Sequence, residues 1–279
     1  MPYWNRVLQR WGERPIDEIT PSDIAALAGH VKRTAVQRRN AHGGNSAAEH
    51  LIGALRCLYK HAVADELISD TKNPAIKIAK PRRRSSTRRG LPDNRVAELV
   101  RVASTTGNDP ALDALLIRLH IETACRRGGA LALRLADVDE QQCLVLLREK
   151  GETQRWQPVS PTLTAHLIAH ARHRGGDHGG TLLRYANGKP ITKSRYDYLW
   201  GRLGKYLPWV RTQQVSTHWL RHTTLTWVER TFGYAVARAF AGHSDSRDVG
   251  TTTTYVRASV EEVAVALSAL TQEPHPLAA

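Results

Sequence analysis

The chain has 279 residues, 41% of them hydrophobic, which is enough for two domains with ordinary packed cores. It carries 40 Lys and Arg against 26 Asp and Glu, and the formal charge of +14 favours nucleic acid as a partner, with a merely solvated basic surface as the alternative. Because there is no apolar run of about 18 residues, no signal peptide and no C-x-x-C pair, we predict a cytoplasmic protein without a membrane span, disulfide framework or cysteine zinc site. A DNA partner would place it at the nucleoid.

Residues 1–76 are predicted to form a small helical domain. Thr20 and Asp23 have the spacing of a capping box ahead of an apolar helical pattern, with a proline between them at the first helical position. Ser46 and Glu49 have the same spacing ahead of a second pattern. Only one short helix fits upstream, and a missing first part is one interpretation of this small size.

Residues 77–90 carry seven cations, no acid and little to bury, which is typical of a linker between domains. Such a cluster can neutralise phosphates and release their counterions, giving affinity without sequence preference. A merely solvated linker is the alternative. The predicted DNA contacts are Lys77, Lys80, Arg82, Arg83, Arg84, Arg88 and Arg89.

Residues 91–279 are predicted to form a larger domain, mainly α with a small β-sheet (an α+β fold). Two apolar runs joined by the turn-like Lys150-Gly151 predict a β-hairpin over 143–159. The last helix opens with a capping box of Ser259 and Glu262. Helical periodicity covers 92–103, 109–123, 162–174, 192–206, 217–230 and 259–270.

Four segments of this larger domain carry candidate catalytic residues. The first, 123–139, reads TACRRGGALALRLADVD and contains Arg126; the second, 149–159, reads EKGETQRWQPV and places Lys150 at the hairpin turn. The third reads STHWLRH over 216–222, and its i, i+3 spacing puts His218 and Arg221 on one helix face. The fourth contains AGHSD over 241–245 and TYV over 254–256, with His243 and Tyr255.

Taken in order, these segments resemble the catalytic boxes of the tyrosine site-specific recombinases, the phage integrase family, over nearly the whole chain. Two features depart from the family pattern. Gly129 stands where the first box usually has Glu, and the twelve residues from His243 to Tyr255 exceed the usual spacing, as an insertion through 247–250 would explain. The resemblance implies six catalytic residues, namely Arg126, Lys150, His218, Arg221, His243 and Tyr255.

The implied chemistry accounts for these residue types. Arg126 and Arg221 would bind the non-bridging oxygens of the scissile phosphate through their planar guanidinium groups, with a further hydrogen bond from His243. Tyr255 would attack the phosphate with His218 as its base, forming a 3′-phosphotyrosine. Lys150 would give a proton to the departing 5′ hydroxyl. No cofactor, metal or ATP is implied, because the phosphotyrosine conserves the energy of the ester.

The resemblance also implies partners. Double-stranded DNA would be clamped between the two domains, and four protomers would pair two sites and exchange strands through a Holliday junction, with accessory DNA-bending or directionality proteins as further candidates. The apolar face of residues 259–270 fits docking on a neighbouring subunit or on its own core, and both possibilities stay open.

Other functions remain as alternatives at this point. A type IB topoisomerase uses similar residues to relax supercoils without pairing two sites, and an inactive DNA-binding relative would lack chemistry altogether. A metal-dependent nuclease would need a carboxylate cluster that the sequence does not show. His218 and His222 as zinc ligands lack a third ligand, and His166, His170 and His173 are predicted to form a polar helix face.

Overall fold

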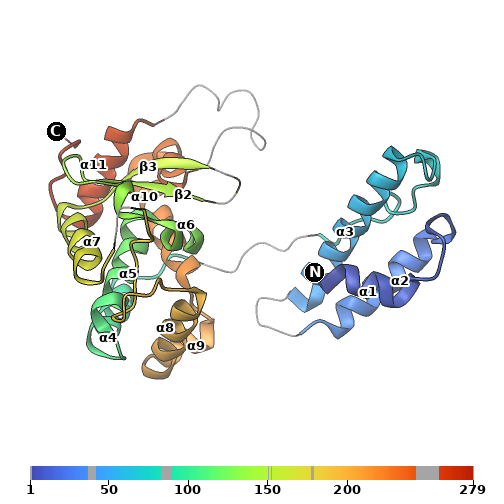
Figure 1. Cartoon of the computed structure of the whole chain (residues 1–279), viewed down its shortest axis with the longest axis horizontal. Helices are drawn as coiled ribbons and strands as arrows, with labels where there is room; N and C mark the ends of the chain where they lie inside the picture. Colours follow the sequence, from blue (N-terminus) through green and yellow to red (C-terminus); the bar gives the residue numbers. More distant parts are fainter. Residues whose placement is uncertain are drawn as a thin grey trace. The chain divides into compact units, whose positions relative to one another are not determined.

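The structure is a computed structural model that describes residues 2–36, 42–82, 89–149, 151, 153–176, 179–242 and 258–278. The chain divides into two compact units, Met1–Thr87 and Arg88–Ala279. Each unit has its own hydrophobic core. Figure 1 shows the helices and strands of both units with their labels. None of the helices in the described ranges is long and apolar enough to cross a membrane.

The first unit is helical, as predicted. The Thr20 hydroxyl accepts the Asp23 N–H and the Asp23 carboxylate accepts the Thr20 N–H, so the predicted capping box is confirmed. The core forms where α2 and α3 pack their apolar faces together. The elements are α1 (Pro2–Trp11), α2 (Pro21–Thr34) and α3 (Asn45–Ala64), with short 3-10 turns at Ile16–Glu18, His42–Gly44 and Asp70–Lys72.

The start of α3 differs from the prediction. Its N-cap is Gly44, so the predicted capping box of Ser46 and Glu49 is wrong, and both residues lie within the first turns of the helix. Gly44 has a φ of 81°, and a Cβ at this position would collide with the Lys32 carbonyl oxygen at the end of α2. The close approach of two helices therefore decides where α3 begins, and a local capping pattern does not reveal it.

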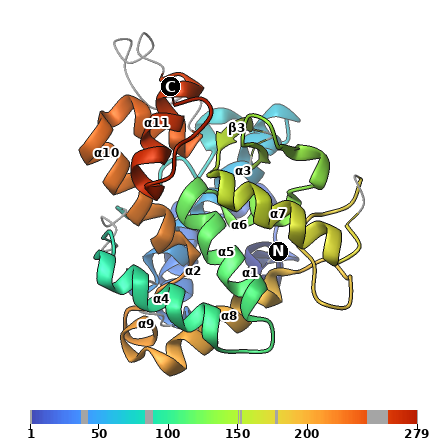
Figure 2. The ribbon, with the colours of Figure 1, turned by 90° about the vertical axis from the view of Figure 1, so that its left-hand side faces the viewer.

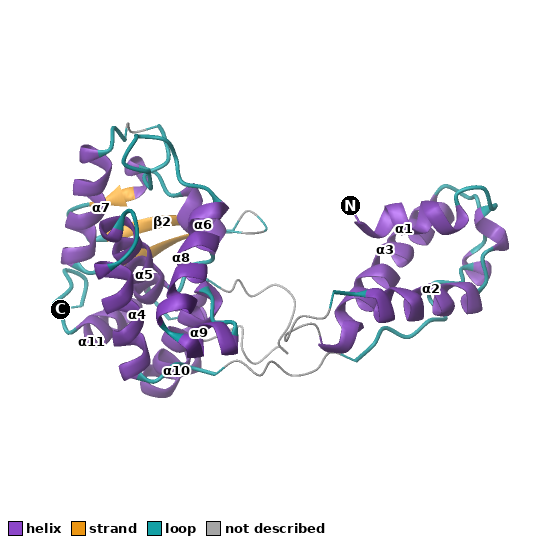
Figure 3. Cartoon of the chain, turned by 90° about the horizontal axis from the view of Figure 1, so that it is seen from below, coloured by secondary structure: helices purple, strands orange, loops and turns teal. Residues whose placement is uncertain are grey.

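The second unit surrounds a small antiparallel sheet with helices, so the predicted fold class is confirmed (Figure 3). The sheet has the order β1-β2-β3, with β1 at Val138–Asp139, β2 at Leu144–Arg148 and β3 at Gln154–Pro158. The predicted hairpin is β2 and β3, in a register that pairs Leu146 with Trp156. Val145 and Leu147 alternate into the core of the unit, as the period of a half-buried strand requires.

Helix α5 lies at the centre of the second unit. Its side chains Leu112, Leu116 and Leu119 are fully buried, and α10 and α7 flank it (Figure 2). The short α6 and α9 have six residues each, too few for a helical period to show in the sequence. The helices are α4 (Asp93–Thr105), α5 (Pro110–Thr123), α6 (Arg127–Ala132), α7 (Pro161–His173), α8 (Lys193–Tyr206), α9 (Pro208–Gln213), α10 (Thr217–Ala241) and α11 (Val260–Thr271), with a 3-10 turn at Leu135–Asp137.

The last helix, α11, packs against its own unit. Its N-terminus has the predicted capping box of Ser259 and Glu262. Val263 and Leu267 are buried in a cluster with Phe240 of α10. Of the two possibilities that the sequence left open, the structure therefore shows docking on the chain's own core.

Candidate active site

The first predicted arginine lies where the chain turns from α5 into α6. Helix α5 ends at Thr123, and its C-cap Ala124 has a left-handed φ of 48° and an N–H that donates to the His120 carbonyl oxygen. Two residues later, Arg126 is the N-cap of α6. Its side chain is 38% exposed, so the guanidinium group borders solvent while the backbone is fixed between two helices.

The second predicted arginine comes from α10 and is buried. The two terminal nitrogens of Arg221 donate to the carbonyl oxygens of Ala124 and Ala241, at 2.5 and 2.8 Å. Burial lowers the pKa of Arg221, and the positive charge of Arg126 lowers it further. The ordinary pKa of arginine is so high that the group stays protonated at neutral pH. Its position is fixed before any anion arrives, which is the preorganisation that transition-state binding needs.

A carboxylate that the sequence analysis missed holds Arg126. Glu149 follows β2, and its side chain is 2% exposed. Its Oε1 accepts the Arg126 backbone N–H at 2.5 Å, and its Oε2 accepts Nη1 of the same arginine at 2.9 Å. Residue 129 is glycine, and a Cβ there would lie 3.1 Å from the Glu149 Cγ. The departure of Gly129 from the family pattern therefore leaves the space that Glu149 fills.

A third arginine near this site was also missed. Arg155 on β3 donates to the carbonyl oxygen of Thr123 at 3.3 Å and to the side chain of Gln157. Burial lowers the pKa of Arg155 to about 10, and the negative charge of Glu149 opposes this shift. The alternation of the strand is the signal that could have found it, because residue 155 shares a face with the buried Gln157.

Arg126, His218 and Arg221 line one cavity of about 480 Å³. His218 is the second residue of α10, one turn before Arg221, so both side chains reach the same space. Trp200 of α8 forms another part of the lining, and its Nε1 donates to the Thr217 hydroxyl at the start of α10 at 2.9 Å. Arg127 lines the cavity as well, and three arginines and an imidazole around one cavity suit the binding of an anion such as a phosphodiester.

A neutral buried pair supports the loop before Arg126. The Nδ1 of His120 lies 3.1 Å from the Cys125 carbonyl oxygen, and its Nε2 lies 2.9 Å from the Tyr196 hydroxyl. Burial lowers the pKa of His120 to about 4 and raises that of Tyr196, so both groups are uncharged at neutral pH. The pair fixes the peptide next to Arg126 without adding charge to the site.

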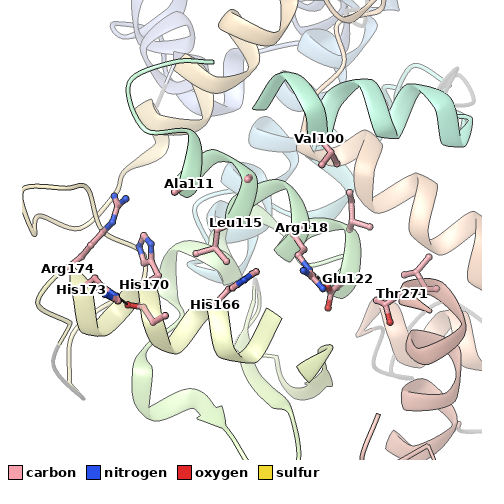
Figure 4. Close-up of a pocket in the computed structure, with 14 residues that line it drawn as sticks. Val100, Ala111, Leu115, Arg118, Glu122, His166, His170, His173, Arg174 and Thr271 are labelled. Carbon is pink, nitrogen blue, oxygen red and sulfur yellow. Dashed lines mark hydrogen bonds and ion pairs between the residues drawn. The ribbon is translucent and has the colours of Figure 1, made fainter. Parts of the chain in front are cut away.

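A larger cavity, of about 730 Å³, shares no lining residue with the arginine site (Figure 4). His166, His170 and His173 of α7 line it, so the predicted polar helix face is only partly correct. His170 is buried, accepts the Arg184 N–H at 3.1 Å, and has a pKa lowered by burial to about 4. Apolar side chains such as Leu115 form much of the remaining wall.

The family model described as the phage integrase family matches residues 89–262, which is more than half of the chain. The chain belongs to the phage integrase family. The tyrosine recombinase predicted from the four motifs is thereby confirmed, and the family match favours a recombinase over a type IB topoisomerase.

Sequence relatives cover most of the chain. The tyrosine recombinase XerD of Lacticaseibacillus casei is 24% identical over 263 residues, covering 92% of this chain and 84% of the relative. The tyrosine recombinase XerD of Mycobacterium leprae is 29% identical over 236 residues, covering 77% of this chain and 70% of the relative.

Solved structures show the same fold. A lambda integrase dimer bound to a core site has a TM-score of 0.66 at 15% identity, with 90% of each chain covered. A Tn1549 transposon integrase in complex with a circular intermediate DNA has a TM-score of 0.65 at 17% identity, covering 86% of this chain and 83% of that one. A lambda integrase tetramer bound to a Holliday junction also has a TM-score of 0.66 at 15% identity, covering 90% and 72%.

Within this phage integrase family member, the structure describes only part of the predicted site. Arg126, His218 and Arg221 come together, whereas Lys150, His243 and Tyr255 lie outside the described residues. In the basic segment, Arg83, Arg84 and Arg88 lie outside them as well. Four cations of that segment are described and exposed, namely Lys77, Lys80, Arg82 and Arg89.

Proposed function

We propose that this member of the phage integrase family cleaves and rejoins DNA at specific sites, with Tyr255 as its nucleophile and a 3′-phosphotyrosine as its intermediate. The observation that carries the proposal is the single cavity lined by Arg126, His218 and Arg221. Residues from the first and third boxes, which lie far apart in the sequence, meet around a space of the right charge for one phosphate.

The two arginines would stabilise the pentacoordinate phosphate. Negative charge grows on the non-bridging oxygens as the tyrosine oxygen attacks, and guanidinium groups can bind such oxygens through parallel hydrogen bonds. The bonds from Arg221 to Ala124 and Ala241 hold one of these groups in place. Little reorganisation would then be needed as the transition state forms. In this proposal His243 supplies a further hydrogen bond to the phosphate.

Proton transfer would divide between two residues. His218 lines the cavity and would accept the proton of Tyr255 as the phosphorus–oxygen bond to the tyrosine forms. Lys150 would give a proton to the 5′ oxygen as its bond to phosphorus breaks. The reverse sequence rejoins the strands, because a 5′ hydroxyl can attack the phosphotyrosine and release the enzyme.

Double-stranded DNA is the proposed substrate, bound by the helical domain 1–76 and the catalytic domain 91–279 with the segment 77–90 between them. The charge of +14 supports a polyanionic partner. The lambda integrase tetramer on a Holliday junction supports a four-protomer assembly here too. We also propose that the protein acts at the nucleoid and that accessory DNA-bending or directionality proteins take part.

The central test uses a nicked suicide substrate, which traps covalent protein–DNA adducts. Tyr255→Phe removes one oxygen, so it should still bind DNA but form no adduct on a denaturing gel. Tyr234→Phe is the matched control, because Tyr234 is an exposed tyrosine of α10, and it should form the adduct. An adduct that persists in Tyr255→Phe, or that maps to another residue by peptide mass spectrometry, would refute the nucleophile assignment.

A further inference from the structure

Glu149 has a buried side chain, and its carboxylate interacts with three arginines. It is ion-paired with Arg126. Its negative charge also acts on Arg155 and Arg221, where it opposes the lowering of the pKa that burial causes. Burying a charge is costly unless it is paired, and the partner of this carboxylate is Arg126.

Its two oxygens act on two parts of the same residue. Oε1 accepts the backbone N–H of Arg126, which is the N-cap of α6, and Oε2 accepts Nη1 of the side chain. The first bond fixes the backbone of Arg126, and the second fixes the direction of its guanidinium group. Arg126 thus has its backbone and its side chain held by one group that comes from the end of β2.

The position of Gly129 explains why this carboxylate comes from the hairpin. Arg126 is the N-cap of α6, which makes Gly129 its third residue. In a capping box, an acid at this third position reaches back to the N–H of the N-cap. Glu149 makes that same bond from another element, and a Cβ on residue 129 would lie 3.1 Å from its Cγ. One carboxylate can therefore occupy this space from either position.

We propose that Glu149 is a positioning residue for Arg126 that holds its guanidinium group toward the cavity. The backbone N–H of Glu149 donates to the carbonyl oxygen of Thr153 at 2.9 Å, so the residue that pairs with Arg126 is itself held where β2 and β3 meet. This inference rests on the proposed DNA cleavage and adds a residue that acts through Arg126 without touching the phosphate.

Single-turnover cleavage of the suicide substrate tests this role. Glu149→Gln keeps the shape and removes the charge, so DNA affinity should be unchanged while cleavage slows by about 10²-fold, the scale expected when a reacting group is misplaced. Glu140→Gln, an exposed acid on the turn between β1 and β2, is the matched control and should cleave like the wild type. Equal rates for both variants and the wild type would overturn the proposal.

A double-mutant cycle separates positioning from general destabilisation. In an Arg126→Lys background, Glu149→Gln should cost little further activity, because the group it positions is already gone. An equal loss in both backgrounds would show that Glu149 acts on something other than Arg126. If the wild type forms no covalent adduct, the proposed cleavage itself fails; a normal wild-type adduct with unaffected Glu149 variants defeats only this inference.

Relocating the carboxylate gives an independent test that holds even if Glu149→Gln folds poorly. Gly129→Glu combined with Glu149→Ala returns an acid to the same space from α6, and it should cleave faster than Glu149→Ala alone. Gly129→Gln with Glu149→Ala has the same shape without the charge and should not recover. Equal activity of the two double variants would refute the need for a carboxylate.

Discussion

At the scale of single residues, Arg126 and Arg221 differ in how they are held. Arg221 is 5% exposed and donates hydrogen bonds to two backbone carbonyl groups. These bonds connect the end of α5 to the end of α10. Arg126 is more exposed and depends on Glu149. A charge that is fixed by hydrogen bonds loses little entropy on meeting the phosphate, so both contacts favour the transition state.

Arg126→Lys tests the guanidinium group itself. The ammonium keeps the charge but cannot form two parallel hydrogen bonds to a phosphate, so cleavage should fall by about 10²–10³-fold, or about 2–4 kcal/mol of transition-state stabilisation. The measurement is the rate of adduct formation at saturating DNA. Arg101→Lys, an exposed arginine of α4 that does not line the cavity, is the control and should change the rate far less. A near wild-type rate in Arg126→Lys would remove this residue from the site.

At the scale of elements, α5 organises the catalytic unit because α8 and α10 are both bonded to it. Thr224 of α10 donates to the Ile121 carbonyl oxygen at 2.7 Å. Asp113 of α5 is fully buried and accepts from Arg195 at 2.8 Å and from Arg202 at 2.5 Å, both on α8. Since α8 carries Trp200, this ion network sets the position of one wall of the cavity.

Asp113→Ala should therefore destabilise the catalytic unit strongly. It would leave two buried guanidinium groups without their counter-charge, and breaking a buried pair in this way typically costs about 3–5 kcal/mol. Urea denaturation followed by tryptophan fluorescence would measure the loss, since Trp200 and Trp209 lie on α8 and α9. Asp197→Asn, an exposed aspartate of α8, should stay within about 0.5 kcal/mol of the wild type. A similar small effect for Asp113→Ala would show that the network contributes nothing to stability.

In the molecule as a whole, a cluster of positive charge coincides with the boundary between the two units. The basic segment lies around the boundary of the units, and its described cations are exposed. A cation that neutralises a phosphate releases a counterion, so each contact made by this segment adds to the salt dependence of binding. The segment would then raise affinity for any DNA, and base contacts made elsewhere would select the site.

Replacing Arg82, Arg83 and Arg84 with Ala should reduce the slope of log affinity against log salt for a non-specific duplex. Each lost phosphate contact is worth about 0.9 in that slope, so a decrease of about 2–3 is expected. Fluorescence anisotropy over a salt series provides the measurement.

The control for charge alone neutralises three exposed cations of the second unit, Arg101, Arg172 and Lys189, which come from three separate elements or loops. Its net charge equals that of the linker variant, so a selective loss of slope in the linker variant identifies phosphate contacts there. Identical slopes for both variants and the wild type would refute phosphate contacts made by the segment 77–90.

The sequence alone determined the features that depend on neighbours in the chain. The capping boxes at Thr20 and Ser259, the periodicity of α5 and the alternation of the hairpin are local, so they predicted these elements correctly. The order of the four motifs predicted the family, and the motifs predicted Arg126, His218 and Arg221, which line one cavity. These residues can be found without a structure because the chemistry restricts each position to one residue type.

Features that depend on contacts between distant segments can be seen only in the tertiary structure. Helix α3 starts at Gly44 because α2 approaches it there, and α11 packs on α10 because their apolar faces meet. Glu149 gave no signal, since an acid at the base of a hairpin is ordinarily solvated. Its role depends on the space that Gly129 leaves, 20 residues away, and packing in three dimensions alone brings the two together.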